Sequence, residues 1–98
     1  MTHAGNATDK QDMIREMREA RAFATEAKLV LVLEAKRQLR QARRGGDPSH
    51  VREMQALIQT LKAQGKAMRR LRDPVAIRAC ADEWQKVIGY LDLVGYSI

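Results

Sequence analysis

Histidine and cysteine side chains carry much of the catalytic and metal-binding chemistry of proteins, and this sequence has few of either. His3 lies near the start of the chain, His50 follows the first proline by two residues, and Cys80 is the single cysteine. None of them has a second histidine or cysteine at metal-ligand spacing. There is also no glycine-rich phosphate loop and no serine–histidine–aspartate arrangement. We therefore predict that the protein is not an enzyme and holds no metal or cofactor.

The feature that most needs an explanation is an apolar run, Leu29-Val30-Leu31-Val32-Leu33. It falls inside a helical pattern that extends from about Asp9 to about Arg44. At about 100° per residue, one narrow stripe of this helix collects apolar and mostly small side chains (Met13, Met17, Ala20, Ala24, Ala27, Leu31, Ala35 and Ala42). Leu29, Val32 and Leu33 point away from that stripe. The middle of the helix is therefore apolar nearly all round and must be covered on more than one side.

The limits of the helices follow from capping signals. Residues 8–11 fit a capping box, so we predict a disordered N-terminal segment over 1–8 and a single helical domain over 9–98. The first helix is expected to end at Gly45-Gly46. Asp47-Pro48 and Asp73-Pro74 each combine an Asp N-cap with a proline at the first helical position, which predicts the starts of a second and a third helix.

Each of these two helices has one apolar face. In the second helix the face is formed by Val51, Met54, Leu57, Ile58, Leu61, Met68 and Leu71, with Gly65 among them. Gly65 is expected to mark either a close helix crossing or a bend. In the third helix the face is formed by Ile77, Cys80, Ala81, Trp84, Val87, Ile88 and Leu91.

These elements predict an all-α fold of three antiparallel helices with a long first helix, because short links favour antiparallel neighbours. The first helix would be roughly 50 Å long and would extend past the other two. A homodimer in which the long helices pair would cover both the overhang and the run Leu29–Leu33. The alternatives are a break of the first helix near Lys28, or a strand over Lys28–Leu33, which lacks a pairing strand and flanking turns.

Composition places the chain among small basic proteins. Its 98 residues suit one domain, and the net charge is +6. It contains no apolar run near the roughly 18 to 20 residues that a membrane span requires, and no apolar segment that resembles a signal peptide. With one cysteine and no disulfide partner for it, the chain is expected in a reducing bacterial cytoplasm.

The positive charge also suggests nucleic-acid binding as an alternative function. One cluster surrounds the first helix opposite its alanines (Arg15, Arg18, Lys36, Arg37, Arg40, Arg43 and Arg44), and a second lies late in the second helix (Lys62, Lys66, Arg69, Arg70 and Arg72). The clusters fall at opposite ends of the predicted helical hairpin. No aromatic side chains are interleaved with them for stacking on bases.

Protein recognition is the first hypothesis. We expect Leu29, Val30, Leu31, Val32 and Leu33 to form the dimer or partner interface. Further partner contacts are expected at Arg37, Arg40, Arg43, Arg44, Tyr90 and Tyr96. Trp84 is the largest side chain on the apolar face of the third helix and is expected in the core, whereas Tyr90 lies off that face.

In size, helical make-up and lack of catalytic groups, the chain resembles the small helical proteobacterial regulators that inhibit a larger protein, quorum-sensing anti-activators among them. The resemblance implies a homodimer that binds and inhibits a partner such as a transcription factor, and it assigns no residue. The architecture also resembles the all-helical chorismate mutases, dimeric enzymes whose first helix holds a dicarboxylate through arginines. Arg21, Lys28 and Arg52 would carry those charges here, although the Ile-Asp steps of that family are missing.

Overall fold

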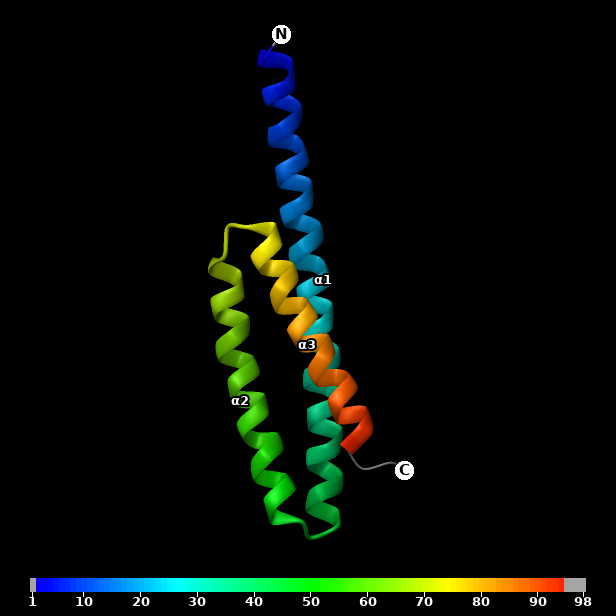
Figure 1. Ribbon diagram of the computed structural model, residues 1–98. Coiled ribbons are helices and arrows are strands. Elements are labelled where there is room, and N and C mark those ends of the chain that lie inside the picture. The colour runs from blue at the N-terminus through cyan, green and yellow to red at the C-terminus, as the bar shows by residue number, and fades with distance from the viewer. Residues whose placement is uncertain (1, 95–98) are drawn as a thin grey trace.

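The computed structural model describes residues 2–94, with side chains described over residues 9–93. It contains three helices, α1 (Thr2–Arg44), α2 (Pro48–Arg70) and α3 (Pro74–Val94). This part of the chain has no strand, so the predicted all-helical fold is confirmed. The molecule is long and thin, 67 × 22 × 14 Å, because α1 projects well beyond the link between α2 and α3 (Figure 1).

α1 is one uninterrupted helix, so the break near Lys28 and the strand over Lys28–Leu33 are both wrong. The physical reason is that residues 9–44 contain neither glycine nor proline, and most of them favour a helix. The helical backbone begins at Thr2 instead of near Asp9. The side chains of residues 1–8 lie outside the described part, so disorder of that segment stays a prediction.

Two backbone hydrogen bonds join the link between α1 and α2 to the last turn of α1. The N–H of Gly46 donates to the Arg43 carbonyl at 3.4 Å, and the N–H of Asp47 donates to the Ala42 carbonyl at 2.9 Å. This pattern requires a left-handed residue, and Gly46 supplies it with a φ of 67°. The Asp47 side chain then accepts a hydrogen bond from the N–H of His50 at 3.2 Å and caps α2. The predicted helix end and helix start are both confirmed.

The second link, between α2 and α3, also contains an aspartate followed by a proline. α2 stops at Arg70, and Leu71 is extended. The helical region is disfavoured for Asp73, because it precedes Pro74. The Asp73 carboxylate accepts a hydrogen bond from the N–H of Val75 at 3.1 Å, and Pro74 is the first residue of α3. The chain reverses direction at both links, so α2 runs back along α1, and α3 then turns back again and lies beside α1 (Figure 1).

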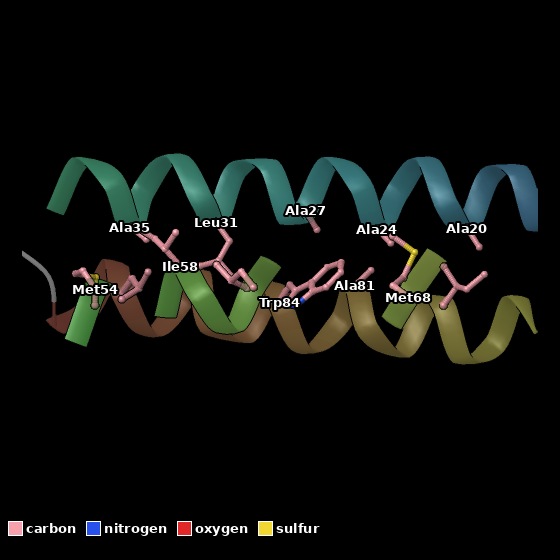
Figure 2. Close-up of a cluster of buried hydrophobic side chains, with 13 residues drawn as sticks. Ala20, Ala24, Ala27, Leu31, Ala35, Met54, Ile58, Met68, Ala81 and Trp84 are labelled. Atoms are coloured by element: carbon pink, nitrogen blue, oxygen red, sulfur yellow. The ribbon is translucent and has the colours of Figure 1, made fainter. Parts of the chain in front are cut away.

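The core lies between one face of α1 and the facing sides of α2 and α3. Figure 2 shows the small side chains of α1 pointing toward Trp84, Ile58 and Met68. We call this the inner face of α1; its fully or nearly fully buried members are Ala20, Ala24, Ala27, Leu31 and Ala35. Because alanine occupies little space, two helices approach the same side of α1 closely. α1 packs against both, whereas α2 and α3 contact each other far less.

Gly65 has a packing role at the crossing of α1 and α2. A Cβ atom at this buried position would lie 2.8 Å from Cε of Lys28, so the missing side chain leaves room for the lysine stem. α2 continues through Gly65 to Arg70 without interruption. The glycine therefore marks a close contact between the helices and does not end the helix.

Candidate interaction surfaces

The structure divides the apolar run of α1 between the core and the surface. Leu31 is fully buried against α2 and α3, and Val32 is half-buried against the same cluster. Leu29 and Leu33 are 56% and 57% exposed, and Val30 is about half exposed. The chain therefore covers two sides of the run by itself. Only Leu29, Val30 and Leu33 remain available for contact with another molecule.

Leu29 and Leu33 belong to a longer stripe on the side of α1 away from the core, and α3 borders one edge of this stripe, where Leu33 and Lys36 share a hollow with Ile88. Its members recur every three or four residues and are all exposed (Ala22, Glu26, Leu29, Leu33, Lys36 and Arg40). At about 100° per residue, this stripe lies on the side of α1 opposite Leu31. We call it the outer face of α1. Its centre is apolar, its N-terminal part contains an acid, and its C-terminal part is basic.

Val30 lies at the edge of this face, beside α3. With Phe23 and Ala27 from α1 and Gln85 and Ile88 from α3, it lines a shallow groove of about 200 Å³. The groove widens the apolar surface from the outer face of α1 toward α3. Glu26 of the outer face contributes a carboxylate to its lining.

A second apolar surface lies where α1 extends past the other helices. Met13 and Ile14 are more than half exposed and, together with Met17, form the apolar side of a hollow of about 550 Å³. Arg18, Arg21 and Arg72 complete its lining. We call this the arginine hollow.

The arginine hollow carries three positive charges. Within the described part of the chain, none of its three arginines lies within ion-pair distance of a carboxylate. Arg21 donates from Nη2 to the Leu71 carbonyl at 3.2 Å, and its Nε is buried with no hydrogen-bond partner there. A buried donor without a partner is costly, so an incoming carboxylate would be favoured at this position.

The groove between α2 and α3 is apolar and open. It has a volume of about 440 Å³, and Met68, Leu71 and Cys80 contribute to its lining. Trp84 is 3% exposed and donates a 2.8 Å hydrogen bond from its indole nitrogen to Oε1 of Gln64. Trp84 is thus a core residue, as predicted. Cys80 is half-buried beside it and free.

A polar cluster joins the three helices near the first link. Gln38 is fully buried; its Nε2 donates to Glu34 at 3.1 Å and to the Leu91 carbonyl at 3.2 Å. Its Oε1 is therefore an acceptor, which assigns a proton to Nε2 of His50 at 2.9 Å. The His50 ring turns inward because it satisfies a buried amide.

Glu34 and Arg37 form an ion pair one turn apart on α1, with Nε of Arg37 donating to Oε2 of Glu34 at 2.9 Å. This hydrogen bond holds the pKa of Glu34 below its ordinary value, and the amide of Gln38 acts in the same direction against the effect of burial. The same pairing raises the pKa of Arg37. Arg37, one of the predicted contact residues, is thus half-buried and already paired with Glu34.

The other predicted contact residues differ in their availability. Arg40, Arg43 and Arg44 are exposed near the C-terminal end of α1, and Tyr90 is exposed on α3. Tyr96 lies outside the described residues. Tyr90 lines neither of the hollows that α3 forms with the outer face of α1.

The three cations with possible counterparts in the chorismate mutases do not converge. Arg21 caps the end of α2 and Lys28 lies over Gly65, both between α1 and α2. Arg52 is exposed near the first link. Along α2, Arg52 is roughly 20 Å from Gly65.

Some of these residues were not identified from the sequence. Glu26 lies outside the apolar run, and the signal that includes it is the spacing of four and three residues from Ala22 to Arg40. The arginine hollow was missed because its members come from α1 and from the second link. The periodicity of a single helix cannot predict that Arg72 lies close to Arg18 and Arg21.

Over the described residues, no group of three or more histidine, cysteine or acidic side chains is placed to hold a metal ion. Within the same part of the chain, no helix is both long and apolar enough to cross a membrane. No family model matches the chain, and neither a curated protein nor a solved structure resembles it significantly.

Proposed function

We propose that the protein is a homodimeric regulator that binds and restrains a larger protein, and that it does so without catalysis. One observation carries this proposal. Among the described residues, six of the nine exposed large apolar side chains lie on α1, at places that α2 and α3 leave uncovered (Met13, Ile14, Phe23, Leu29, Val30 and Leu33). A small protein that exposes so much apolar surface on one helix is built for contact with other chains.

The two surfaces suit different occupants. The outer face of α1 has a compact apolar centre in Leu29 and Leu33, with an acid toward one end and bases toward the other. A second copy of the chain would cover it. The arginine hollow combines an apolar wall with three cations that have no carboxylate partner among residues 9–93. Its charge is the same in every copy, so a segment of a different, acidic protein suits it better.

The partner segment is therefore expected to be amphipathic, with acidic side chains beside apolar ones. Its carboxylates would bind Arg18, Arg21 and Arg72, and its apolar side chains would cover Met13 and Ile14. Bidentate pairing of arginine with carboxylate gives such a contact both strength and orientation. An acidic surface of a transcription factor would have this chemistry, in keeping with an anti-activator role.

The test is site-specific cross-linking in the source cells. A photoreactive amino acid at Ile14 should cross-link a protein that the same amino acid at Leu93 does not, since Leu93 is 86% exposed on α3 and far from the hollow. Mass spectrometry identifies the product. The purified partner should then lose affinity by about tenfold or more for each of Arg18→Glu and Arg72→Glu, because each reversal replaces attraction with repulsion.

Both arginine variants should keep the helicity and the solution mass of the wild-type protein. If Ile14 and Leu93 yield the same products, or if the charge reversals leave partner binding unchanged, the hollow is not the partner site. A partner whose activity does not change when the protein binds would contradict the inhibitory role.

Nucleic-acid binding is the second candidate, and one observation favours it. The solvent side of α2 carries a line of exposed bases, Arg52, Lys66 and Arg70, without ion pairs to carboxylates within the described part. Fluorescence anisotropy with duplex and single-stranded oligonucleotides tests it. Affinity should fall steeply with salt and in the variants Lys66→Glu and Arg70→Glu. Absence of binding at low salt would eliminate this candidate.

A further inference from the structure

The outer face of α1 has an order of residue types that determines how two copies fit together. From Ala22 to Arg40 its members are separated by four, three, four, three and four residues. This is the spacing of the contact seam between two coiled helices. It is also symmetric, since Leu29 and Leu33, Glu26 and Lys36, and Ala22 and Arg40 lie at equal distances on either side of Leu31.

We propose that a second copy of this chain pairs with the outer face of α1 in an antiparallel register centred on Leu31. This inference rests on the proposed function only in taking the outer face as a surface of self-association. In this register Leu29 of one copy meets Leu33 of the other, twice. The four leucines, each more than half exposed in the single chain, form the apolar centre of the interface.

The charges distinguish this register from a parallel one. In the antiparallel pair Glu26 of each copy lies opposite Lys36 of the other, so two attractive pairs flank the leucines. In a parallel, in-register pair Glu26 would face Glu26, Lys36 would face Lys36 and Arg40 would face Arg40. Glu26 and Lys36 are both exposed and have no ion-pair partner within the described part of the chain. Like charges across a helix seam oppose pairing.

The antiparallel register also leaves the rest of the molecule undisturbed. The inner face of α1 points toward α2 and α3 (Figure 2), and the outer face lies on the opposite side of the helix. The cores of both copies therefore lie on the far sides of the two α1 helices, and α3 of each copy borders the seam along one edge. In this register residue 18 of one copy lies opposite residue 44, the last of α1, in the other. The apolar side of each arginine hollow, Met13, Ile14 and Met17, therefore extends past the end of the other copy's α1, at opposite ends of the dimer.

The first experiment measures solution mass over a dilution series. The wild-type protein should be a dimer. Leu33→Glu should weaken the dimer by at least about a hundredfold, because each dimer loses two leucines from its centre. Leu93→Glu is the matched control, an exposed leucine on α3 whose change should leave the mass unaltered.

The second experiment exchanges charges. Glu26→Lys or Lys36→Glu alone should weaken the dimer by roughly tenfold, because either change sets like charges opposite each other. The double variant should regain the wild-type dissociation constant. The control exchanges the charges of the exposed Glu83–Lys86 pair on α3 (Glu83→Lys with Lys86→Glu) and should have no effect on the mass.

The third experiment determines the register directly, in a Cys80→Ser background. A mixture of Ala22→Cys chains and Arg40→Cys chains should form the mixed disulfide under mild oxidation. Neither variant alone should form a disulfide efficiently, because in the antiparallel pair two copies of position 22 lie roughly 27 Å apart. A parallel dimer would give the opposite pattern.

The outcomes separate this inference from the proposed function. A dimer that Leu33→Glu disrupts, but that shows no charge rescue and no mixed disulfide, overturns the register and leaves self-association intact. A wild-type monomer at all concentrations overturns the register together with the dimeric part of the proposed function. Neither result bears on the arginine hollow, whose partner is tested by cross-linking.

Discussion

The inner and outer faces of α1 draw leucines from one five-residue run, yet they meet different surroundings. Leu31, on the inner face, is fully buried, whereas Leu29 and Leu33 on the outer face are more than half exposed. The inner face is otherwise built from alanines, so two helices fit against it at close range. The outer face mixes leucine with Glu26, Lys36 and Arg40. Small side chains thus specify contact within the chain, and leucines framed by opposite charges suit contact between chains.

The largest expected effect comes from placing a charge on each face in turn. Leu31→Glu should destabilise the fold by more than about 4 kcal/mol, because it removes a buried leucine and places a carboxylate without a partner in the core. Leu29→Glu should leave helicity intact and change only association. Circular dichroism melting and light scattering of both variants measure this difference. A folded Leu31→Glu protein with wild-type mass would refute the division of α1 into two faces.

Enlarging one alanine on each face of α1 tests the same difference between the inner and outer faces, with a smaller expected effect. Ala24→Leu should destabilise the protein by about 1 to 3 kcal/mol, because the inner face has no room for three more carbon atoms. Ala22→Leu, two residues away on the exposed outer face, should be close to neutral for folding and should strengthen self-association. Urea denaturation of the two variants gives the difference. Equal midpoints would mean that the inner face is loosely packed.

The glycines of α2 and α3 sharpen the contrast between crowded and open sides. Gly89→Ala should stabilise α3 by up to about 1 kcal/mol, because nothing lies within 4 Å of the added Cβ. Gly65→Ala gains the same helix propensity but must displace the end of the Lys28 side chain, so its net effect should be smaller. Thermal melting at fixed concentration compares them. A larger gain at Gly65 would show that Lys28 does not fill the gap.

The smallest effect is expected at the border of the two faces, where Glu34 is half-buried. Its pKa is lowered chiefly by the hydrogen bond from Arg37, so the pairing stabilises the native state above the ordinary pKa of a glutamate. This stabilisation is lost as the pH falls through the lowered pKa. Glu34→Gln should therefore melt below the wild-type protein near pH 7 and close to it at about pH 3. A difference that persists in acid would point to packing.

Local signals determined most of the fold. The helical pattern from Asp9 to Arg44 predicted one long helix, with a break near Lys28 as the alternative. Gly45-Gly46 and the two Asp-Pro steps marked where it ends and where the others start. The alanine stripe predicted the buried side of α1. These features are set by neighbours three or four residues apart, and the sequence displays them directly.

The surfaces were less predictable. Periodicity showed that Leu29 and Leu33 point away from Leu31, but not whether α2 and α3 would cover them as well. Val32 became half-buried because α2 packs on its side, and His50 turned inward because a buried Gln38 needed a donor. The arginine hollow exists only because the second link brings Arg72 to the overhang of α1.

The sequence by itself therefore determined three helices, their capped ends, the buried stripe of α1 and the spacing of its outer face. All of these depend on backbone geometry and on residues close along the chain. The tertiary structure decided which apolar side chains are left for other molecules and which charges lack partners. Those properties depend on where α2 and α3 lie against α1, which is set by contacts between residues far apart in the chain, such as Gln38 with the Leu91 carbonyl.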